Sequence, residues 1–152
     1  MITIRKARIE DLQRLLDFEQ GIVEAERPFD PTLIETHFHY YNIEEMLHRD
    51  DCAIVVAETD GKLIGSGSAR VQEGKPYNSF EQYAFLGFMY IAPECRGAGI
   101  NSKIIDALVD WATSKGLAEV RLQVYSENMN ALRAYEKVGF KPLLTEMRLA
   151  RS

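Results

Sequence analysis

Met89-Tyr90-Ile91-Ala92-Pro93-Glu94-Cys95-Arg96-Gly97-Ala98-Gly99-Ile100-Asn101-Ser102 is the stretch of sequence that decides the fold. It completes an apolar run over residues 83–92, typical of a central strand, and leads into a helical repeat of apolar positions over residues 98–115. Such a junction directs the free N–H groups of the first helical turn, and the positive end of the helix dipole, at one place. The sequence therefore predicts an anion-binding turn.

The residues of the turn suit a phosphate, although a turn that needs glycine only for its φ angles would look the same. Gly97 and Gly99 let the backbone approach a phosphate closely, Arg96 adds a charge-assisted donor and Ser102 adds a hydroxyl. A P-loop is excluded because it requires a lysine that is absent here. A dinucleotide fingerprint fits poorly, since Ser102 replaces its third glycine and no acidic residue ends the next strand.

Arg-Gly-x-Gly-Ile over residues 96–100, preceded by Pro-Glu, resembles the acetyl-CoA signature of the GNAT superfamily of N-acetyltransferases. A second block, residues 125–140, resembles the Asn-x-x-Ala-x-x-x-Tyr-x-x-x-Gly-Phe pattern of the same family, with Asn128 and Tyr135 at its polar positions. The resemblance is specific over residues 89–142 and loose over residues 4–12. Residues 20–80 share only the order of elements.

Hydrophobic periodicity and turn signals predict a single α/β domain over residues 1–152. The resemblance implies a mixed, largely antiparallel central sheet flanked by helices, in the order β-α-α-β-β-β-α-β-α-β. Strands are expected near residues 2–5, 52–57, 62–71, 83–92, 119–125 and 140–149, and helices near residues 11–23, 32–47, 98–115 and 128–138.

The resemblance also implies where acetyl-CoA binds. In the family, the strands before the glycine turn and after the helix splay apart, and the pantetheine arm lies in the gap. Asn101 departs from the glycine or alanine of the family signature, but its backbone N–H remains available. The backbone of Met89 and Ile91 is expected to hold the pantetheine and to polarise the acetyl carbonyl. The expected cofactor-binding residues are Met89, Ile91, Arg96, Gly97, Ala98, Gly99, Ile100, Asn101, Ser102 and Asn128.

Tyr135 corresponds to the family's general acid, which protonates the departing CoA thiolate. The alternative is a tyrosine whose ring only packs against the sheet. Asn128 is expected either to contact the pantetheine or to cap the helix that follows it. Many family members place a glutamate, the general base, where this chain has Phe85. The base is therefore elsewhere, reached through water or unnecessary, and the candidates are Glu81, Tyr90, Glu35 and His39.

The net charge of −5 is confined to one part of the chain. The first fifty residues carry six basic and eleven acidic side chains, and the remainder carries twelve of each. This acidity argues against general nucleic-acid binding. Since the acidic third supplies the helices that face the acceptor in this family, we expect a cationic acceptor.

No metal site is expected. Cys52 and Cys95 lie far apart, with no second ligand at metal-binding spacing near either. On a helix, His37 and His39 would point in nearly opposite directions and so would not share an ion. No signal-peptide hydrophobic region and no run of ~18 apolar residues is present. We therefore expect a cytoplasmic protein with no membrane partner.

The sequence is thus interpreted as an enzyme that transfers the acetyl group of acetyl-CoA to a primary amine by direct attack in a ternary complex. The acceptor is expected to be a small-molecule or peptide amine, and the last strand offers an edge for a homodimer. The alternative is a sensor or structural module that binds acetyl-CoA without turnover. A nucleotide-dependent oxidoreductase is a weaker alternative.

Overall fold

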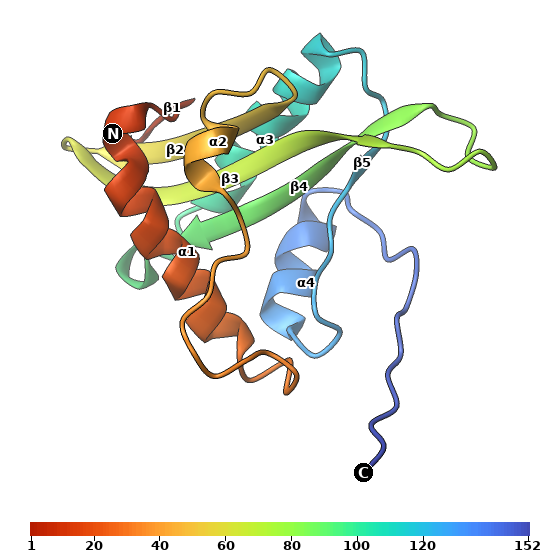
Figure 1. The fold of residues 1–152 in the computed structure, drawn as a ribbon. Helices are drawn as coiled ribbons and strands as arrows, with labels where there is room; N and C mark the ends of the chain where they lie inside the picture. Colours follow the sequence, from red (N-terminus) through yellow and green to blue (C-terminus); the bar gives the residue numbers. More distant parts are fainter.

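The computed structural model describes all 152 residues, which form a mixed five-stranded sheet with helices on both faces (Figure 1). The strands follow the order β1-β2-β3-β4-β5; the first three pairings are antiparallel and β4 and β5 are parallel. The strands are β1 (Thr3–Lys6), β2 (Cys52–Thr59), β3 (Lys62–Glu73), β4 (Gln82–Ile91) and β5 (Val120–Arg121). The helices are α1 (Leu12–Glu26), α2 (Ile43–Met46), α3 (Ile100–Ser114) and α4 (Met129–Lys137), with short 3-10 turns η1 (Ile9–Asp11) and η2 (Pro93–Cys95). The predicted α/β class and largely antiparallel sheet are confirmed.

The β2–β3 hairpin forms where the sequence predicts it. Asp60 and Gly61 occupy the turn with φ of 51° and 74°, the two positive values that a tight hairpin turn requires. β2 is buried along most of its length, which explains its continuous run of apolar residues. This hairpin forms the centre of the sheet together with β4.

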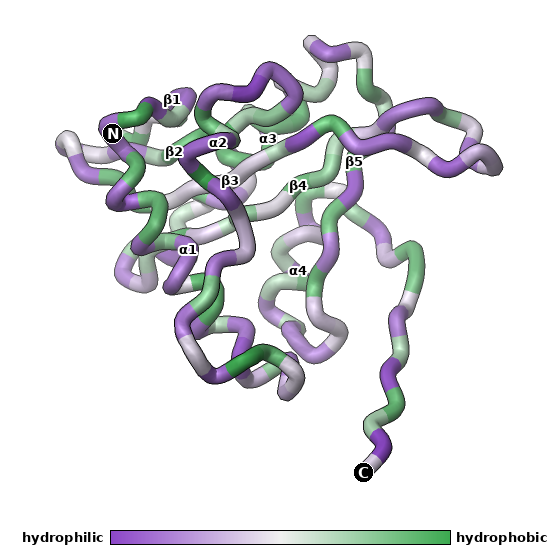
Figure 2. The backbone as a smooth tube through the Cα atoms, viewed as in Figure 1, coloured by the Kyte–Doolittle hydropathy of each residue, from purple (hydrophilic) through white to green (hydrophobic).

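Two apolar cores lie on opposite faces of the sheet. On one face, α1 packs through Leu15, Phe18 and Ile22. On the other face, α3 packs through Ile104 and Leu108. Hydrophobic and hydrophilic residues alternate along α1, as expected for a helix with one buried face (Figure 2). The sheet therefore presents one face to α1 and the loop that follows it, and the other to α3.

The segment between α1 and β2 corrects one prediction. The helix expected over residues 32–47 is wrong: only α2 is helical, and residues 27–42 form an irregular loop. Side chains of α1 and of Arg27, the residue that follows it, hold this loop by bonding its backbone, which the apolar spacing does not reveal. The Arg27 guanidinium donates to the Ile34 carbonyl at 2.8 Å, and the Gln20 amide donates to the Phe38 carbonyl at 3.0 Å.

The C-terminal third also departs from expectation. The strand predicted over residues 119–125 is shortened to β5, and the strand predicted over residues 140–149 does not form. A strand needs a neighbour, and beyond Arg121 the chain offers none at this edge of the sheet. The tail instead runs away from the sheet with its apolar side chains exposed (Figures 1 and 2). These exposed side chains are Leu143, Leu144, Met147 and Leu149.

The edge strand through which a second copy was expected to pair is therefore absent, and the homodimer stays a prediction. None of the helices has the length and apolar character needed to cross a membrane.

Candidate active site

β4 and β5 separate soon after they meet. β4 pairs with β5 only at Ala84 and Phe85, yet it continues to Ile91 (Figure 1). The Ala92 N–H bonds to β3 through the Ile64 carbonyl at 2.8 Å. Because successive residues of a strand direct their N–H and C=O groups to alternate sides, those of Met89 and Ile91 face the gap rather than β3. Backbone groups that bond to neither neighbouring strand thus line the opening beside β4, and of these the Ile91 carbonyl accepts a side-chain hydrogen bond from Arg96.

A bulge shapes β4 just before this edge. The register with β3 shifts between Ser66 and Ser68, and Phe88 takes a φ of 55°, unusual for a residue with a side chain. Side chains bond to its displaced backbone. The Ser66 hydroxyl donates to the Phe88 carbonyl at 3.0 Å, and the Phe88 N–H donates to the Tyr41 hydroxyl at 3.0 Å. The bulge therefore links β3, β4 and the loop before α2.

The glycine turn leaves a row of amides free. Gly97 and Gly99 take φ of 85° and 75°, and a Cβ added at either position would meet nothing within 4 Å. No N–H group from Gly97 to Ser102 donates a hydrogen bond within the chain. The positive end of α3 begins among these groups. Free amides, open space and a helix dipole in one place fit a diphosphate.

Two polar side chains of the turn are engaged locally. Arg96 donates from Nε to the Ile91 carbonyl at 3.2 Å, which leaves its other guanidinium nitrogens exposed. The Ser102 hydroxyl donates to the Gly99 carbonyl at 2.9 Å and retains its acceptor lone pairs. Both side chains therefore stabilise the turn, and Arg96 also keeps donors directed outward.

α4 carries the two residues of the second block. The Asn128 side-chain oxygen accepts the Ala131 N–H at 3.2 Å, so Asn128 caps the helix. Capping is one of the two roles expected from the sequence. Tyr135 lies edge-on to Phe140, with ring centroids 6.0 Å apart. Burial, and to a smaller extent the charge of Glu26, raise the pKa of Tyr135 to about 12. The phenol therefore keeps its proton at neutral pH.

The four base candidates lie in different elements and loops of the structure. Glu81 lies exposed in the β3–β4 hairpin, and Glu35 is exposed in the loop after α1. The ring of Tyr90 stacks on Phe18 with centroids 4.7 Å apart.

His39 is held by a buried carboxylate of α1. Its Nδ1 lies 2.6 Å from a carboxylate oxygen of Glu19, a fully buried residue of α1. The second oxygen of Glu19 accepts the Tyr41 N–H at 2.9 Å. His37 and His39 lie in a loop with ring centroids 4.9 Å apart, so the expected helical separation is wrong. The chain contains no group of three or more His, Cys, Asp or Glu side chains arranged to hold a metal ion.

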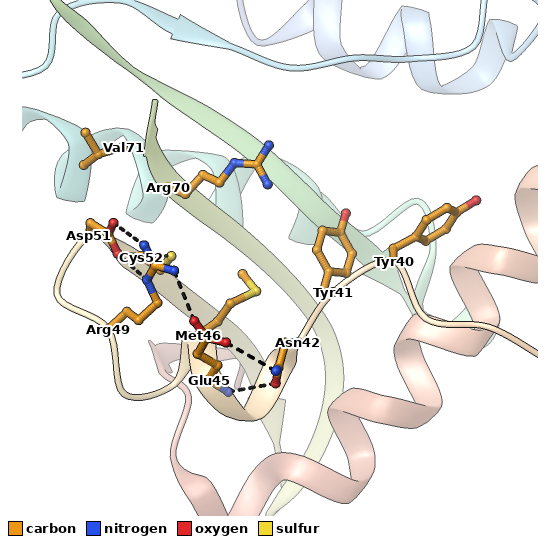
Figure 3. Close-up of a pocket in the computed structure, with 10 residues that line it drawn as sticks. All are labelled: Tyr40, Tyr41, Asn42, Glu45, Met46, Arg49, Asp51, Cys52, Arg70 and Val71. Carbon is orange, nitrogen blue, oxygen red and sulfur yellow. Dashed lines mark hydrogen bonds and ion pairs between the residues drawn. The ribbon is translucent and has the colours of Figure 1, made fainter. Parts of the chain in front are cut away.

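A cavity of about 240 Å³ lies between the loop before α2, α2 itself and β3 (Figure 3). Arg49 is paired on one side of it with Asp51 at 2.6 Å and Glu45 at 3.2 Å. Its lining residues are Tyr40, Tyr41, Asn42, Glu45, Met46, Arg49, Asp51, Cys52, Arg70 and Val71. Tyr40 and Tyr41 lie at the end of the cavity nearest α1 (Figure 3).

Sequence reasoning missed a cluster at the end of α1. Glu26 interacts electrostatically with Tyr135, which lies more than a hundred residues later in the chain. The Tyr125 hydroxyl donates to Asp30 at 2.9 Å. Neither pair follows from periodicity, because the loop that brings these side chains together was predicted as a helix. The one signal available in the sequence was Glu26, a carboxylate at the end of a predicted helix with no basic residue four positions away.

The profile of the acetyltransferase (GNAT) family matches residues 16–140. The chain belongs to this family. A thialysine N-epsilon-acetyltransferase of Sus scrofa is 35% identical, over 93% of this chain and 85% of that protein. An aminoglycoside N(6')-acetyltransferase type 1 of Salmonella typhimurium is 27% identical, over 68% of this chain and 72% of that protein.

A solved structure shares the fold. A predicted acetyltransferase of Clostridium acetobutylicum, solved with acetyl-CoA, has a TM-score of 0.73 and 22% identity, covering 99% of this chain and 96% of that one. Two other curated relatives are longer, and the chain spans 25% and 41% of their lengths. The prediction of a GNAT domain with acetyl-CoA as its co-substrate is confirmed at the level of the family.

Proposed function

We propose that the protein transfers the acetyl group of acetyl-CoA to a primary amine by direct attack in a ternary complex. The observation that carries this proposal is the continuity of one binding path. The backbone of Met89 and Ile91 that faces the gap leads along β4 into the glycine turn, where free amides suit a diphosphate. Family membership supplies the co-substrate that such a path fits.

The residues of the path have separate roles in this proposal. Amides from Gly97 to Ser102, with Arg96, bind the diphosphate. Backbone groups of Met89 and Ile91 hold the pantetheine and stabilise the negative charge that develops on the acetyl oxygen. Asn128 orders the start of α4, and contact with the pantetheine stays a prediction.

Tyr135 acts as the general acid. As the amine nitrogen bonds to the acetyl carbon and the bond from carbon to sulfur breaks, the phenol of Tyr135 gives its proton to the leaving thiolate. The tyrosinate then takes back the proton that the new amide nitrogen releases. The phenol of Tyr135 is protonated at neutral pH, so it has a proton to give when sulfur becomes negative.

The acceptor is proposed to be a cationic small molecule or peptide amine. The acidic first third of the chain supplies α1 and the loop beside it, which lie on the sheet face opposite α3. The names of the porcine and Salmonella relatives, an amino-acid analogue and an aminoglycoside acetyltransferase, both denote amine acceptors.

The second candidate function is binding of acetyl-CoA without turnover, which the absence of a glutamate at Phe85 favours. Calorimetric titration with CoA tests the shared part of both functions, and no binding at hundreds of micromolar overturns both. Release of free thiol from acetyl-CoA in the presence of thialysine, kanamycin or a short peptide separates them. Turnover with any of these amines supports the transferase, and CoA binding without turnover supports the sensor.

A further inference from the structure

Arg70, near the end of β3, is an exposed cation that takes part in no ion pair. Its Nε donates to the side-chain oxygen of Gln72 at 3.2 Å, and neither of its two Nη atoms donates a hydrogen bond within the chain. Phe85 stands directly opposite it on β4, and the Arg70 guanidinium carbon lies 4.9 Å from the centroid of that ring. The ring positions the guanidinium but carries no formal charge, so the two outer nitrogens stay free.

The other charged side chains that line the cavity beside Arg70 neutralise one another. Arg49 donates to both oxygens of Asp51, from Nε at 2.8 Å and from Nη2 at 2.6 Å. It also donates to Glu45 at 3.2 Å, and the second oxygen of Glu45 accepts the Asn42 amide at 3.3 Å. Both carboxylates of the lining are therefore engaged, and Arg70 is its one unpaired charge. The cavity, about 240 Å³ in volume, suits a ligand with a negative group.

The free end of Arg70 matches a carboxylate. Its two Nη atoms form a planar fork whose N–H groups can bind both oxygens of a carboxylate at once. One guanidinium balances the single charge of a carboxylate. A phosphate carries up to two charges, and the second would lie near Glu45 and Asp51 without a cation to balance it. Figure 3 shows the Arg70 guanidinium extending from β3 toward Tyr41, so a carboxylate bound there lies on the Tyr41 side of the cavity.

Tyr41 connects this cavity with the bulge of β4. It lines the cavity, and its hydroxyl accepts the Phe88 N–H at 3.0 Å. The same hydroxyl lies over Gly87, where an added Cβ would stand 3.0 Å from it. Met89, whose backbone faces the gap between β4 and β5, follows Phe88 directly. The cavity and the proposed path of the co-substrate therefore meet at the bulge.

We propose that Arg70 binds a carboxylate of the acceptor, and that the acceptor is a long-chain amino acid whose terminal amine is acetylated. This inference rests on the proposed function, which puts the acetyl group beside Met89. Phe85, opposite Arg70, and Met89 are separated along β4 by about 13 Å at the rise of a strand. The Arg70 side chain covers part of this distance (Figure 3). An α-amino group is attached to the carbon next to the carboxylate and does not span the rest, whereas an amine at the end of a lysine-length chain does.

The test compares two amines of equal length, 6-aminohexanoate and 6-aminohexanamide, which differ only in having a carboxylate or an uncharged amide. For the wild type we expect kcat/KM to be roughly tenfold higher, or more, with 6-aminohexanoate, because a charge-assisted pair is lost with the amide. In Arg70→Gln the two values are expected to come within about threefold of each other, through a fall for 6-aminohexanoate alone. Glycine tests the length, since its amine is next to the carboxylate, and we expect no measurable acetylation of it.

Arg14→Gln is the matched control. The Arg14 guanidinium carbon also lies over a phenylalanine ring, 4.7 Å from the centroid of Phe18, but on α1 and away from the cavity lining. It is expected to leave both values unchanged. Arg70→Lys keeps the charge without the fork, and is expected to retain part of the preference for the carboxylate. In Arg70→Gln the loss appears in KM while kcat stays within about threefold, as for a group that only binds. An equal loss with both amines, or a wild type without a preference, overturns the inference.

A binding measurement separates this inference from the proposed function. 6-Aminohexanoate is titrated into each protein saturated with CoA, and we expect its affinity to fall roughly tenfold or more in Arg70→Gln while CoA affinity is unchanged. Equal affinity in the two proteins, or no binding to the wild type, overturns the role of Arg70 even if other amines are acetylated. If no amine is acetylated, the proposed function fails, and a tenfold loss of binding in Arg70→Gln still supports the carboxylate site.

Discussion

The Tyr41 hydroxyl accepts a hydrogen bond from the Phe88 N–H at 3.0 Å, and so ties the loop before α2 to the bulge of β4. Tyr41→Phe removes the acceptor and leaves an amide of the bulge without a partner. An unsatisfied donor in a largely buried place costs about 1–3 kcal/mol. We expect the free energy of unfolding, measured in urea, to fall by about that amount.

Tyr40→Phe is the matched control for this change. The Tyr40 hydroxyl is buried without a hydrogen bond of ordinary geometry, so its removal relieves a desolvated group. The free energy of unfolding is expected to stay level or to rise slightly. Equal losses in the two variants would contradict the assignment of the stabilising bond to Tyr41.

The sequence predicts the core of the fold well because the elements there form their backbone hydrogen bonds locally or with the next strand. Asp60 and Gly61 specify the hairpin turn, and Gly116, with a φ of 76°, ends α3 where the periodicity stops. The glycine turn follows from the same chemistry, because its free amides result from a strand meeting a helix. These features require no knowledge of distant contacts.

The errors lie where long-range contacts decide the structure. The apolar spacing of residues 32–47 satisfies a helix, but Glu19 of α1 and Arg27 just after it bond the loop backbone instead. The hydrogen bond from Tyr125 to Asp30 was missed for the same reason, since only the folded loop brings these side chains together. The strand over residues 140–149 has a suitable pattern but no neighbour. Pattern alone does not supply the second edge that a strand needs.

Gly99→Ala tests the diphosphate part of the site. Gly99 has a φ of 75°, where an alanine is strained by about 1–2 kcal/mol although nothing in the chain blocks its methyl group. The methyl also stands where a phosphate approaches the amides of the turn. We expect CoA affinity, measured by calorimetry, to fall at least tenfold.

Gly61→Ala provides the control, because Gly61 has nearly the same φ, 74°, equally open surroundings and a place in the remote β2–β3 hairpin. The two variants are expected to lose similar stability, while only Gly99→Ala loses CoA affinity. A similar loss of affinity in both would show that the effect comes from destabilisation rather than from the turn.

The ion pair between Arg5 and Asp11 predicts a pH dependence of stability. The two side chains join by two hydrogen bonds of 2.9 and 3.0 Å, and Asp11 is only 10% exposed. The Arg5 guanidinium lowers the pKa of Asp11 below its usual value. This stabilisation is complete above the unfolded pKa, near 3.9, and is lost as the pH falls through the lower folded value.

Asp11→Asn is therefore expected to unfold more easily than the wild type at pH 6, by about 1–3 kcal/mol in urea. The difference between the two proteins shrinks progressively below pH ~4. Asp51→Asn breaks the exposed pair with Arg49, and is expected to have a much smaller effect at either pH. A difference between wild type and Asp11→Asn that persists unchanged at pH 2 would contradict this account.

Tyr135→Phe tests the general acid directly. The change removes the proton donor and keeps the ring that packs against Phe140. We expect kcat for thiol release to fall roughly 100-fold while CoA affinity stays the same, since the hydroxyl acts only when sulfur becomes negative. Tyr77→Phe, at an exposed position in the β3–β4 hairpin, is the control and leaves kcat unchanged.

The pH profile distinguishes this role from packing. The phenol acts in its protonated form, and burial raises the pKa of Tyr135 to about 12, so the acid persists through the whole range in which the amine loses its proton. In the wild type, kcat is therefore expected not to decline between pH 8 and about 10. A decline centred near pH 10 would indicate an ordinary, solvated phenol. An unchanged kcat in Tyr135→Phe would assign the protonation of the thiolate to water or to another residue.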